Sequence, residues 1–397
     1  MNTLNYLFAS LVLVASCSTK PSMREIGNDV FDLAVSQFEL LASQLPDDAT
    51  ARSAENGKIV SAPIKWWCSG FFPGSLAYTY AWTGNNKMRD LAIAQSAKLD
   101  SLFCGRYKTS HDVGFMTMCS YGKLREFGIT DTIPALLPAA VEKLAGRFSP
   151  ITGTTQSWDS RRGWLWPVII DNMMNLELLM EYGSTDQQKM ALSHADRTIE
   201  NHFRPDYTTW HVVDYDPADG SIRGKQTHQG YSDASAWARG QAWALYGYTM
   251  MSREAAKKGF SDNAARYLSQ AENIAKMLFA KLPSDGIPAW DFDAPVLAPA
   301  GSPEATLKDA SAAAIMASAF VELSALTADK RLSRRCHKMA ETQIRTLASP
   351  EYLSAKGENC GFLIKHCVGN LPGNSEIDVP LSYADYYFLE ALYRINN

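Results

Sequence analysis

The sequence predicts an all-α fold, an (α/α)6 barrel of six inner and six outer helices. Two observations indicate helices in two layers. Six stretches are apolar nearly all round, as buried helices are, and their starts lie 40 to 74 residues apart. More amphipathic stretches alternate with them, as expected of helices with one exposed face. A third observation argues against a β-rich fold, since few windows alternate with period two.

The elements are expected in the order outer helix, loop, inner helix, repeated around the barrel. The predicted inner helices are residues 74–84, 114–128, 171–183, 240–253, 310–326 and 384–395. The amphipathic stretches include residues 86–103, 133–148, 187–203, 263–282 and 331–348. Each spacing suits one helical hairpin plus a loop.

The N-terminus carries the pattern of a bacterial export signal. Residues 5–16 form a short apolar run, too short to span a membrane, and small residues precede Cys17. We expect 1–17 to be a lipoprotein-type signal with Cys17 lipidated; an ordinary secretory signal cleaved nearby is the alternative. Residues 18–30 would form an N-terminal tether and 31–397 the catalytic barrel. The protein would then be periplasmic, attached to a membrane only through Cys17.

Composition narrows the function. The chain has 397 residues and a net charge of −4, which argues against a nucleic-acid partner. Its 10 Trp, 17 Tyr and 16 Phe suit sugar binding, although core packing explains most of them. Six cysteines follow Cys17, without a CxxC or zinc-type spacing, so we expect no metal. Cys360 and Cys367 are the closest pair for a disulfide in an oxidising compartment.

Two carboxylates are the candidates for acid–base chemistry. Pro167 suits the first position of a helix, which would put Asp171 in the second turn among apolar neighbours, where burial raises a carboxyl pKa. The alternative is an Asp bonded to Asn175 or to loop backbone. Asp112 looks like a helix cap, but His111 and Gly114 beside it favour a functional role. On consecutive inner helices, the two carboxylates could face each other across one barrel mouth, as in sugar chemistry.

The stretch 227–243 holds candidates for binding an acidic sugar. Asp233 looks like the N-cap of a helix on which Arg239 and Trp243 share a face. The guanidinium would pair with a sugar carboxylate and the ring would stack on the sugar; an Arg that neutralises a buried Asp is the alternative. His211 lies in a predicted loop. Several Trp at one end of the barrel would line a sugar cleft.

Taken in order, the motifs resemble one family. HDVGFM, WPVIIDNMMNLELL, HQGYSDASAWARGQAW, IPAWDFDAP, KDASAAAIMASAFVEL and EIDVPLSYADYYFLEAL resemble the unsaturated glucuronyl hydrolases, glycoside hydrolase family 88, from about Trp66 to the C-terminus. The resemblance implies an (α/α)6 barrel without metal or cofactor. It also implies hydration of the C4=C5 vinyl ether of a 4,5-unsaturated uronic acid at the non-reducing end of a lyase-generated oligosaccharide.

The same resemblance implies roles for individual residues. Asp171 matches the general acid and base, and Asp112 matches the carboxylate that binds the sugar and sets the protonation of its partner. The implied substrate contacts are His111, His211, Thr227, Gln229, Arg239 and Trp243, with Trp66, Trp158 and Trp237 as aromatic cleft residues. Alternatives are an unsaturated rhamnogalacturonyl hydrolase and a non-catalytic glycan-binding lipoprotein.

The parent polysaccharide stays open among chondroitin, hyaluronan, heparin-type, ulvan and gellan fragments. A likeness of GNLPGNSEIDVPLSYADYYF to gut-type members favours animal glycosaminoglycans. Lys365, His366 and Asn374 are candidates for the subsite beyond the uronate.

Overall fold

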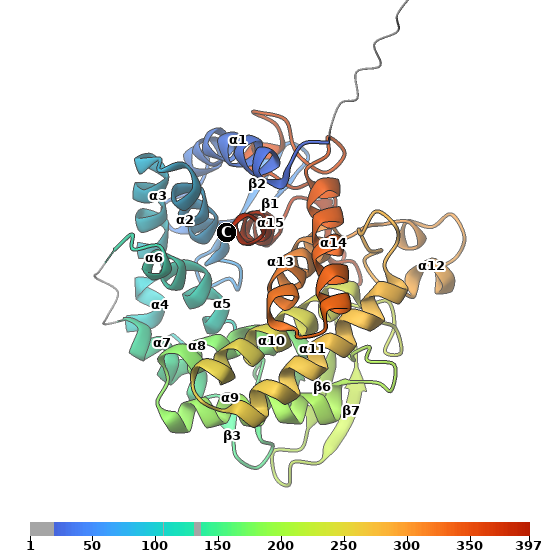
Figure 1. Ribbon diagram of the computed structural model, residues 1–397. Coiled ribbons are helices and arrows are strands. Elements are labelled where there is room, and N and C mark those ends of the chain that lie inside the picture. The colour runs from blue at the N-terminus through green and yellow to red at the C-terminus, as the bar shows by residue number, and fades with distance from the viewer. Residues whose placement is uncertain (1–19, 106, 131–135) are drawn as a thin grey trace, which may run out of the picture.

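A computed structural model describes residues 20–105, 107–130 and 136–397 (Figure 1). The predicted export signal and Cys17 lie outside the described residues. Within those ranges no helix is long and apolar enough to cross a membrane.

Six helical segments of the described chain surround the barrel axis, as predicted (Figure 1). They are α2 (Phe71–Thr83), α5 (Val113–Thr117) with its continuation, the π-helical turn η1 (Met118–Gly122) and α6 (Lys123–Glu126), η2 (Ile170–Asn175) with α8 (Leu176–Tyr182), α10 (Ala238–Lys257), α13 (Ala310–Leu326) and α15 (Ser382–Asn396). Each segment packs against the next and α15 packs against α2, so the ring closes. Helices α10 and α13 are buried along most of their length because outer helices or loops cover their outer faces.

The outer layer in the described ranges consists of α1 (Met23–Ser43), α3 (Asn86–Ala97), α7 (Leu136–Ala145), α9 (Thr185–His202), α11 (Ser261–Lys281) and α14 (Lys330–Leu347). Helix α1 corrects the predicted tether, because residues 23–30 already belong to the barrel. Ser22 caps α1 by accepting the Glu25 N–H at 3.2 Å, and the Glu25 carboxylate accepts the Ser22 N–H at 2.7 Å. Ile26 and Val30 of α1 are buried against the rest of the barrel.

Short antiparallel hairpins fill the loops that lead from outer to inner helices. They comprise β1 (Ala49–Glu55) with β2 (Lys58–Pro63), β3 (Phe148–Ser149) with β4 (Thr154–Thr155), β5 (Trp166–Ile169) with β6 (Val212–Tyr215) and β7 (Ile222–Gln226), and β8 (Cys367–Asn370) with β9 (Ser375–Val379). In the central sheet Trp166 lies opposite Tyr215, and Val212 opposite Gln226. Four short helices complete the connections: α4 (Asp100–Cys104), α12 (Ala294–Leu297), η3 (Pro303–Ala305) and η4 (Asn359–Gly361).

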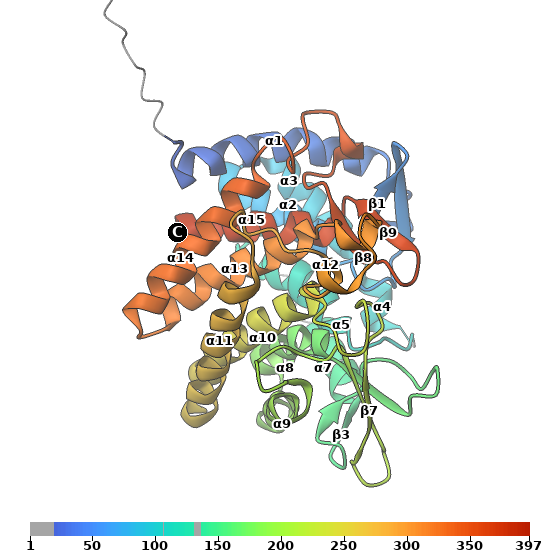
Figure 2. The ribbon, with the colours of Figure 1, turned by 90° about the vertical axis from the view of Figure 1, so that its right-hand side faces the viewer.

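These hairpins distinguish the two ends of the barrel. Figure 2 shows β1, β7, β8 and β9 gathered on one side, where the inner helices begin. The turns from inner to outer helices are short, with only residues 84–85 between α2 and α3 and 183–184 between α8 and α9. We call the end with the hairpins the loop mouth and the end with the short turns the turn mouth. The long loops, which are the usual place for a binding site, therefore lie at the loop mouth.

An aromatic column packs the barrel axis between the two mouths. The rings of Phe115 and Trp243 are 5.3 Å apart, those of Trp243 and Tyr387 5.5 Å, and those of Tyr387 and Tyr246 5.4 Å. These residues come from α5, α10 and α15 and are at most 6% exposed. The column bridges opposite sides of the ring, so the interior is a core rather than a channel.

Candidate active site

The two candidate carboxylates lie at the starts of neighbouring inner helices at the loop mouth. Asp112 is the residue directly before α5, and Asp171 is the second residue of η2. One local prediction was wrong: Pro167 lies in strand β5, opposite Asp214, and does not start the helix. Asp171 is therefore in the first helical turn. The β5–β6 pairing places it there, because the strand ends at Ile169, directly before η2.

Asp171 has the properties of a general acid. Its side chain is 14% exposed, and its Oδ2 accepts no hydrogen bond from the described residues. Burial raises its pKa to about 7, against the nearby positive charge of Arg239, and the negative charge of Asp112 raises it further. A carboxyl group with this pKa is protonated and ionised in comparable amounts near neutral pH, so it can both donate and accept a proton.

His211 presents an N–H to this carboxyl group. Its Nδ1 accepts the backbone N–H groups of His228 and Gln229, both at 3.2 Å. Burial lowers the His211 pKa well below its ordinary value, so the ring is neutral and the proton lies on Nε2. Nε2 is 3.6 Å from Asp171 Oδ2. A loop histidine is thus fixed as a donor beside the acid.

Asp112 does not use its carboxylate to cap the helix it begins. No backbone N–H of α5 binds it. Ser110 Oγ donates to its Oδ2 at 2.6 Å, and His111 Nε2 lies 3.3 Å from its Oδ1. The side chain keeps some exposure at the mouth. The interpretation of Asp112 as a side-chain cap was therefore wrong, and its carboxylate stays free to face a ligand.

Asn175 organises this pair, and sequence reasoning missed its role. Its Oδ1 accepts the Phe115 N–H at 2.8 Å, so its Nδ2 donates to His111 Nδ1, 3.1 Å away. His111 Nδ1 is thereby an acceptor, and the ring proton lies on Nε2, toward Asp112. Asn175 does not bind Asp171, which removes one half of the alternative considered from the sequence, an Asp bonded to Asn175.

Gly114 lets these two inner helices meet. A Cβ atom on Gly114 would lie 2.5 Å from Asn175 Cα, well inside van der Waals contact. Glycine at this position therefore allows the close backbone approach of α5 and η2.

Arg239 is engaged by the protein itself. Its Nη1 donates to Asp309 Oδ2 at 2.9 Å and to the Val368 carbonyl at 2.5 Å, and its Nη2 donates to the Gly369 carbonyl. The side chain is buried, and its guanidinium carbon lies 4.5 Å from the centre of the Trp237 ring. The structure thus shows the alternative, an Arg that neutralises a buried Asp. Pairing with a substrate carboxylate stays a prediction.

The neighbouring contact candidates lie around Arg239. Trp243 is fully buried, so its ring belongs to the aromatic column rather than to an open stacking surface, while its indole N–H lowers the Asp171 pKa. Gln229 Nε2 donates to the Gly369 carbonyl at 3.0 Å. Thr227 N–H donates to Asp233 Oδ1 at 2.8 Å, so the predicted N-cap role of Asp233 was wrong; α10 begins after Trp237.

The three predicted cleft tryptophans differ in exposure. Trp237 is buried with its ring 4.5 Å from that of His211, and it covers that histidine. Trp66 is 39% exposed beneath Arg52, whose guanidinium carbon lies 4.9 Å from the ring centre. Trp158 is half-buried at the mouth, 6.3 Å from the His211 ring. Trp66 and Trp158 are therefore the two whose side chains keep part of their surface exposed.

The candidates beyond the uronate lie on a strained hairpin beside this mouth. His366 and Asn374 both have positive φ, 62° and 50°, and His366 Nδ1 is 2.7 Å from Asp378 Oδ1. Lys365 Nζ donates to the Pro350 carbonyl at 2.7 Å. Its ammonium is thereby directed at backbone.

A second buried carboxyl shows why pKa alone does not identify the acid. Burial raises the pKa of Asp385 to about 7 as well. Its two oxygens accept the N–H groups of Leu363 and Ile364 at 3.0 and 2.8 Å, and the residue is 2% exposed. Asp385 fastens a loop to α15, whereas Asp171 has a buried oxygen without a hydrogen bond on a side chain that is 14% exposed.

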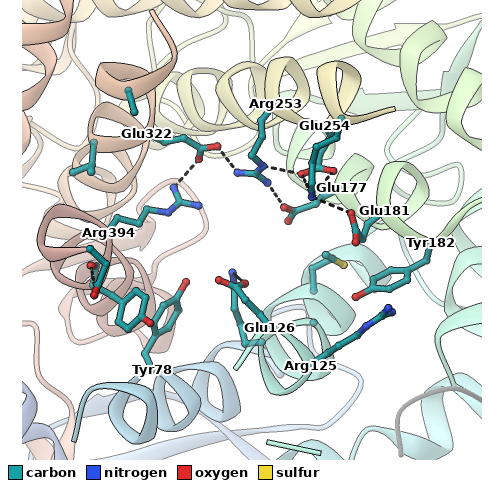
Figure 3. A pocket seen from close by; sticks show the side chains of 18 residues that line it. Tyr78, Arg125, Glu126, Glu177, Glu181, Tyr182, Arg253, Glu254, Glu322 and Arg394 are labelled. Atoms are coloured by element: carbon teal, nitrogen blue, oxygen red, sulfur yellow. Dashed lines mark hydrogen bonds and ion pairs between the residues drawn. The ribbon is translucent and has the colours of Figure 1, made fainter. Parts of the chain in front are cut away.

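A cavity of about 640 Å³ opens at the turn mouth, away from both carboxylates (Figure 3). Arg253 contacts Glu177, Glu254 and Glu322 there, and Arg394 lies 2.9 Å from Glu322. The carboxylates that bind Arg253 are thus neutralised by cations. We assign the chemistry to the loop mouth, where a carboxyl group is unpaired.

Two further expectations concern cysteine and metal. Within the described ranges Cys360 and Cys367 are free, as are the other four cysteines there, so the predicted pair does not form a disulfide. No group of three or more His, Cys, Asp or Glu side chains in the described ranges is placed to hold a metal ion.

Comparison with known proteins agrees with this geometry. No family model matches the chain. A curated relative from Formosa agariphila, named unsaturated glucuronyl hydrolase, is 39% identical over 347 residues, which cover 84% of this chain and 81% of the relative. A crystal structure described as unsaturated glucuronyl hydrolase specific for heparin is 39% identical, with a TM-score of 0.84 over 93% of this chain and 96% of that one.

A third relative, from Streptococcus pyogenes, is named unsaturated chondroitin disaccharide hydrolase and is 26% identical over 376 residues, 91% of this chain and 89% of the relative. The likeness to the Formosa relative spans most of both chains. The chain belongs to the unsaturated glucuronyl hydrolases, a family of α/α-barrel glycoside hydrolases.

Proposed function

We propose that the protein removes a 4,5-unsaturated uronic acid from the non-reducing end of glycosaminoglycan oligosaccharides by hydrating the C4=C5 vinyl ether. One observation carries this proposal: Asp171 has a pKa of about 7 and an oxygen without a hydrogen bond, beside a neutral His211. Protonating an electron-rich vinyl ether needs one acid that is still protonated near neutral pH.

Each step can be assigned to residues at the loop mouth. The Asp171 carboxyl group gives its proton to C4, and the positive charge that develops at C5 is shared with the ring oxygen. The resulting carboxylate accepts a proton from water as the water oxygen bonds to C5. The product is a hemiketal, in which the bond between C5 and the ring oxygen breaks to give a ketone at C5 and a hydroxyl group on C1. C1 then carries this hydroxyl group and the glycosidic oxygen as an open-chain hemiacetal, which collapses to an aldehyde and releases the rest of the oligosaccharide.

The neighbouring groups support this sequence. His211 Nε2–H, 3.6 Å from Asp171, can hold the carboxylate in position between the two proton transfers. Asp112 binds sugar hydroxyl groups and raises the Asp171 pKa through its negative charge. The starts of α5 and η2 present N–H groups that favour the anionic sugar.

The substrate class rests on the relatives. The crystal structure at 39% identity is described as specific for heparin, whereas the chondroitin disaccharide hydrolase is 26% identical. We therefore place heparin-type unsaturated disaccharides first and chondroitin-type disaccharides second. The names of these relatives also favour a glucuronyl over a rhamnogalacturonyl substrate.

A panel of lyase-generated disaccharides tests the proposal. Hydration removes the ultraviolet absorbance of the C4=C5 bond conjugated to the carboxylate. We expect loss of absorbance with heparin-type or chondroitin-type disaccharides and none with the Asp171→Asn variant. A glycan-binding protein without catalysis would bind the disaccharides and leave the absorbance unchanged, which would contradict the proposal.

We also propose that the protein is exported and anchored to a bacterial membrane through a lipid on Cys17. The support is the apolar run 5–16 and the small residues before Cys17. Expression with a labelled fatty acid should give a labelled protein in the membrane fraction, and Cys17→Ala should lose the label. An unlabelled wild-type chain would contradict the lipid anchor.

A further inference from the structure

Among the described residues at the loop mouth, Arg161 is an arginine whose guanidinium has neither a carboxylate partner nor a hydrogen bond. Arg239 pairs with Asp309, Arg52 with Glu376 at 2.7 Å, and Arg147 with Asp159 at 3.2 Å. Among the described residues no carboxylate pairs with Arg161, and no hydrogen bond engages its guanidinium; the group lies on the Trp158 ring, with its carbon 3.9 Å from the ring centre. Its N–H donors are free for a ligand.

A tight turn fixes Arg161 in this place. The Arg161 carbonyl accepts the Trp164 N–H at 2.9 Å across Arg162 and Gly163, whose φ values are 52° and 82°. Positive φ at both central residues is the geometry of a type I′ turn. The non-glycine Arg162 adopts it at some cost, and such strain is concentrated at functional sites.

Aromatic and imidazole rings pack against the side chains of the turn. Trp164 is buried, and its ring stacks on that of Trp158 at 6.0 Å. Arg162 Nη1 lies 2.9 Å from His228 Nδ1. Burial lowers the His228 pKa to about 4, so this ring is a neutral acceptor and Arg162 is engaged. Arg161 is the cation of the turn that remains available.

The position of Arg161 relative to the two carboxylates indicates which substrate group it meets. Its charge interacts with Asp112, and it lowers the pKa of His111 and His211 after the larger effect of burial. The charges that act most on Asp171 are instead Arg239 and Asp112. The uronate carboxylate is attached to C5, next to the carbon that Asp171 protonates, so it lies on the Asp171 side. Arg161 lies instead on the Trp158 ring, whose centre is 6.3 Å from that of the His211 ring, and it is not among the charges that act most on Asp171.

We propose that Arg161 binds a sulfate ester on the substrate and so determines which sulfated disaccharides the enzyme accepts. This inference rests on the proposed function, because it assumes the same disaccharides at the same mouth. A guanidinium matches the oxygens of a sulfate with paired N–H donors, and Trp158 holds its plane in a fixed orientation. The sugar ring itself then contacts the exposed surface beside Trp158.

The test compares sulfated and unsulfated forms of one unsaturated disaccharide. For wild type, Arg161→Gln, Arg161→Lys and the control Arg334→Gln, kcat/KM is measured from the loss of absorbance. Arg334 is exposed on α14, so its substitution removes one positive charge without touching the mouth. Arg161→Gln should lower the ratio of sulfated to unsulfated kcat/KM about tenfold for at least one sulfated isomer, mainly through KM. Arg161→Lys should restore part of the ratio, and Arg334→Gln should leave it unchanged.

A structural role for Arg161 would give another result. If it only packs on Trp158, its substitution lowers both rates alike and the ratio stays constant, which would overturn the proposal. A wild-type enzyme that hydrolyses the unsulfated disaccharide and none of its sulfated isomers would also overturn it.

Calorimetric binding to Asp171→Asn and to Asp171→Asn/Arg161→Gln separates this proposal from the reaction. Weaker binding of a sulfated isomer to the double variant supports the sulfate site even if wild type shows no turnover, an outcome that would contradict only the proposed function. Equal binding to both variants overturns the sulfate site.

Discussion

The pH dependence of kcat/KM follows from the pKa of Asp171. Burial raises this pKa to about 7, and the protonated form is the one that reacts. From a pKa of about 7, the protonated fraction is ~90% at pH 6, ~10% at pH 8 and ~1% at pH 9. We therefore expect kcat/KM to fall about tenfold between pH 6 and 8 and about ninefold more by pH 9. A carboxyl at its ordinary value of 3.8 would be under ~1% protonated at pH 6 and would give no plateau there.

The assay is the initial rate of absorbance loss at subsaturating disaccharide from pH 5 to 9. The substrate carboxylate and sulfate do not titrate in this range, so the alkaline limb reports the enzyme. Asp112→Asn removes a negative charge that raises the Asp171 pKa, so its limb should move to lower pH. A wild-type limb centred below pH 5, or an Asp112→Asn limb that moves upward, would refute the assignment of Asp171.

Three further predictions follow from contacts of the site and the turn mouth. Because the pKa of Asp171 is raised on folding, its ionisation destabilises the protein increasingly between pH 4 and 7; Asp171→Asn should raise Tm at pH 8 and hardly at pH 4, and an equal gain at both would contradict this. Asn175→Asp cannot donate to His111 Nδ1, so kcat should fall roughly 10–100-fold, and nitrogen NMR should show the ring proton moving to Nδ1; an unchanged tautomer would exclude this positioning role. Arg253→Met removes the cation that contacts three glutamates, of which Glu322 keeps Arg394 and Glu254 keeps Lys257, and should lower the free energy of unfolding by about 3 kcal/mol in urea, against little change for the exposed Arg334→Met; a loss under ~1 kcal/mol would show that the network adds little.

The barrel was predictable because a helix that is buried on all sides has apolar residues on all its faces, which the sequence shows directly. Inner helices such as 310–326 are apolar on every face, whereas outer helices keep one charged face. Asp171 was predictable for the same reason, since its apolar neighbours in the sequence are also its neighbours in space. The start of the first outer helix was assigned to a tether. The local signal for this start is the Ser22–Glu25 capping box, which lies only a few residues after the apolar run that ends before Cys17.

The rest depends on contacts between distant segments. Pro167 suits a helix start by itself, but pairing with Asp214, 47 residues later, makes it part of a strand. Arg239 has two reasonable partners in the sequence, and only the fold places Asp309 beside it. No local pattern encodes that Asn175 meets His111 across two helices. Local chemistry thus gave the candidate residues, and tertiary contacts decided which partners several of them have.

The two mouths of the barrel differ in how their carboxyl groups are paired. At the turn mouth, Arg253 and Arg394 lower the pKa of Glu322 against the effect of burial, so this carboxyl group is a poor proton donor near neutral pH. At the loop mouth Arg239 is the positive charge that acts most on Asp171. Asp309 already neutralises Arg239, so much of the attraction of Arg239 for the Asp171 carboxylate is cancelled. Desolvation then dominates and keeps Asp171 protonated. The raised pKa of Asp171 therefore depends on the pairing of Arg239 with Asp309. An unpaired Arg239 would lower the Asp171 pKa, and the carboxyl group would then have no proton to give to C4.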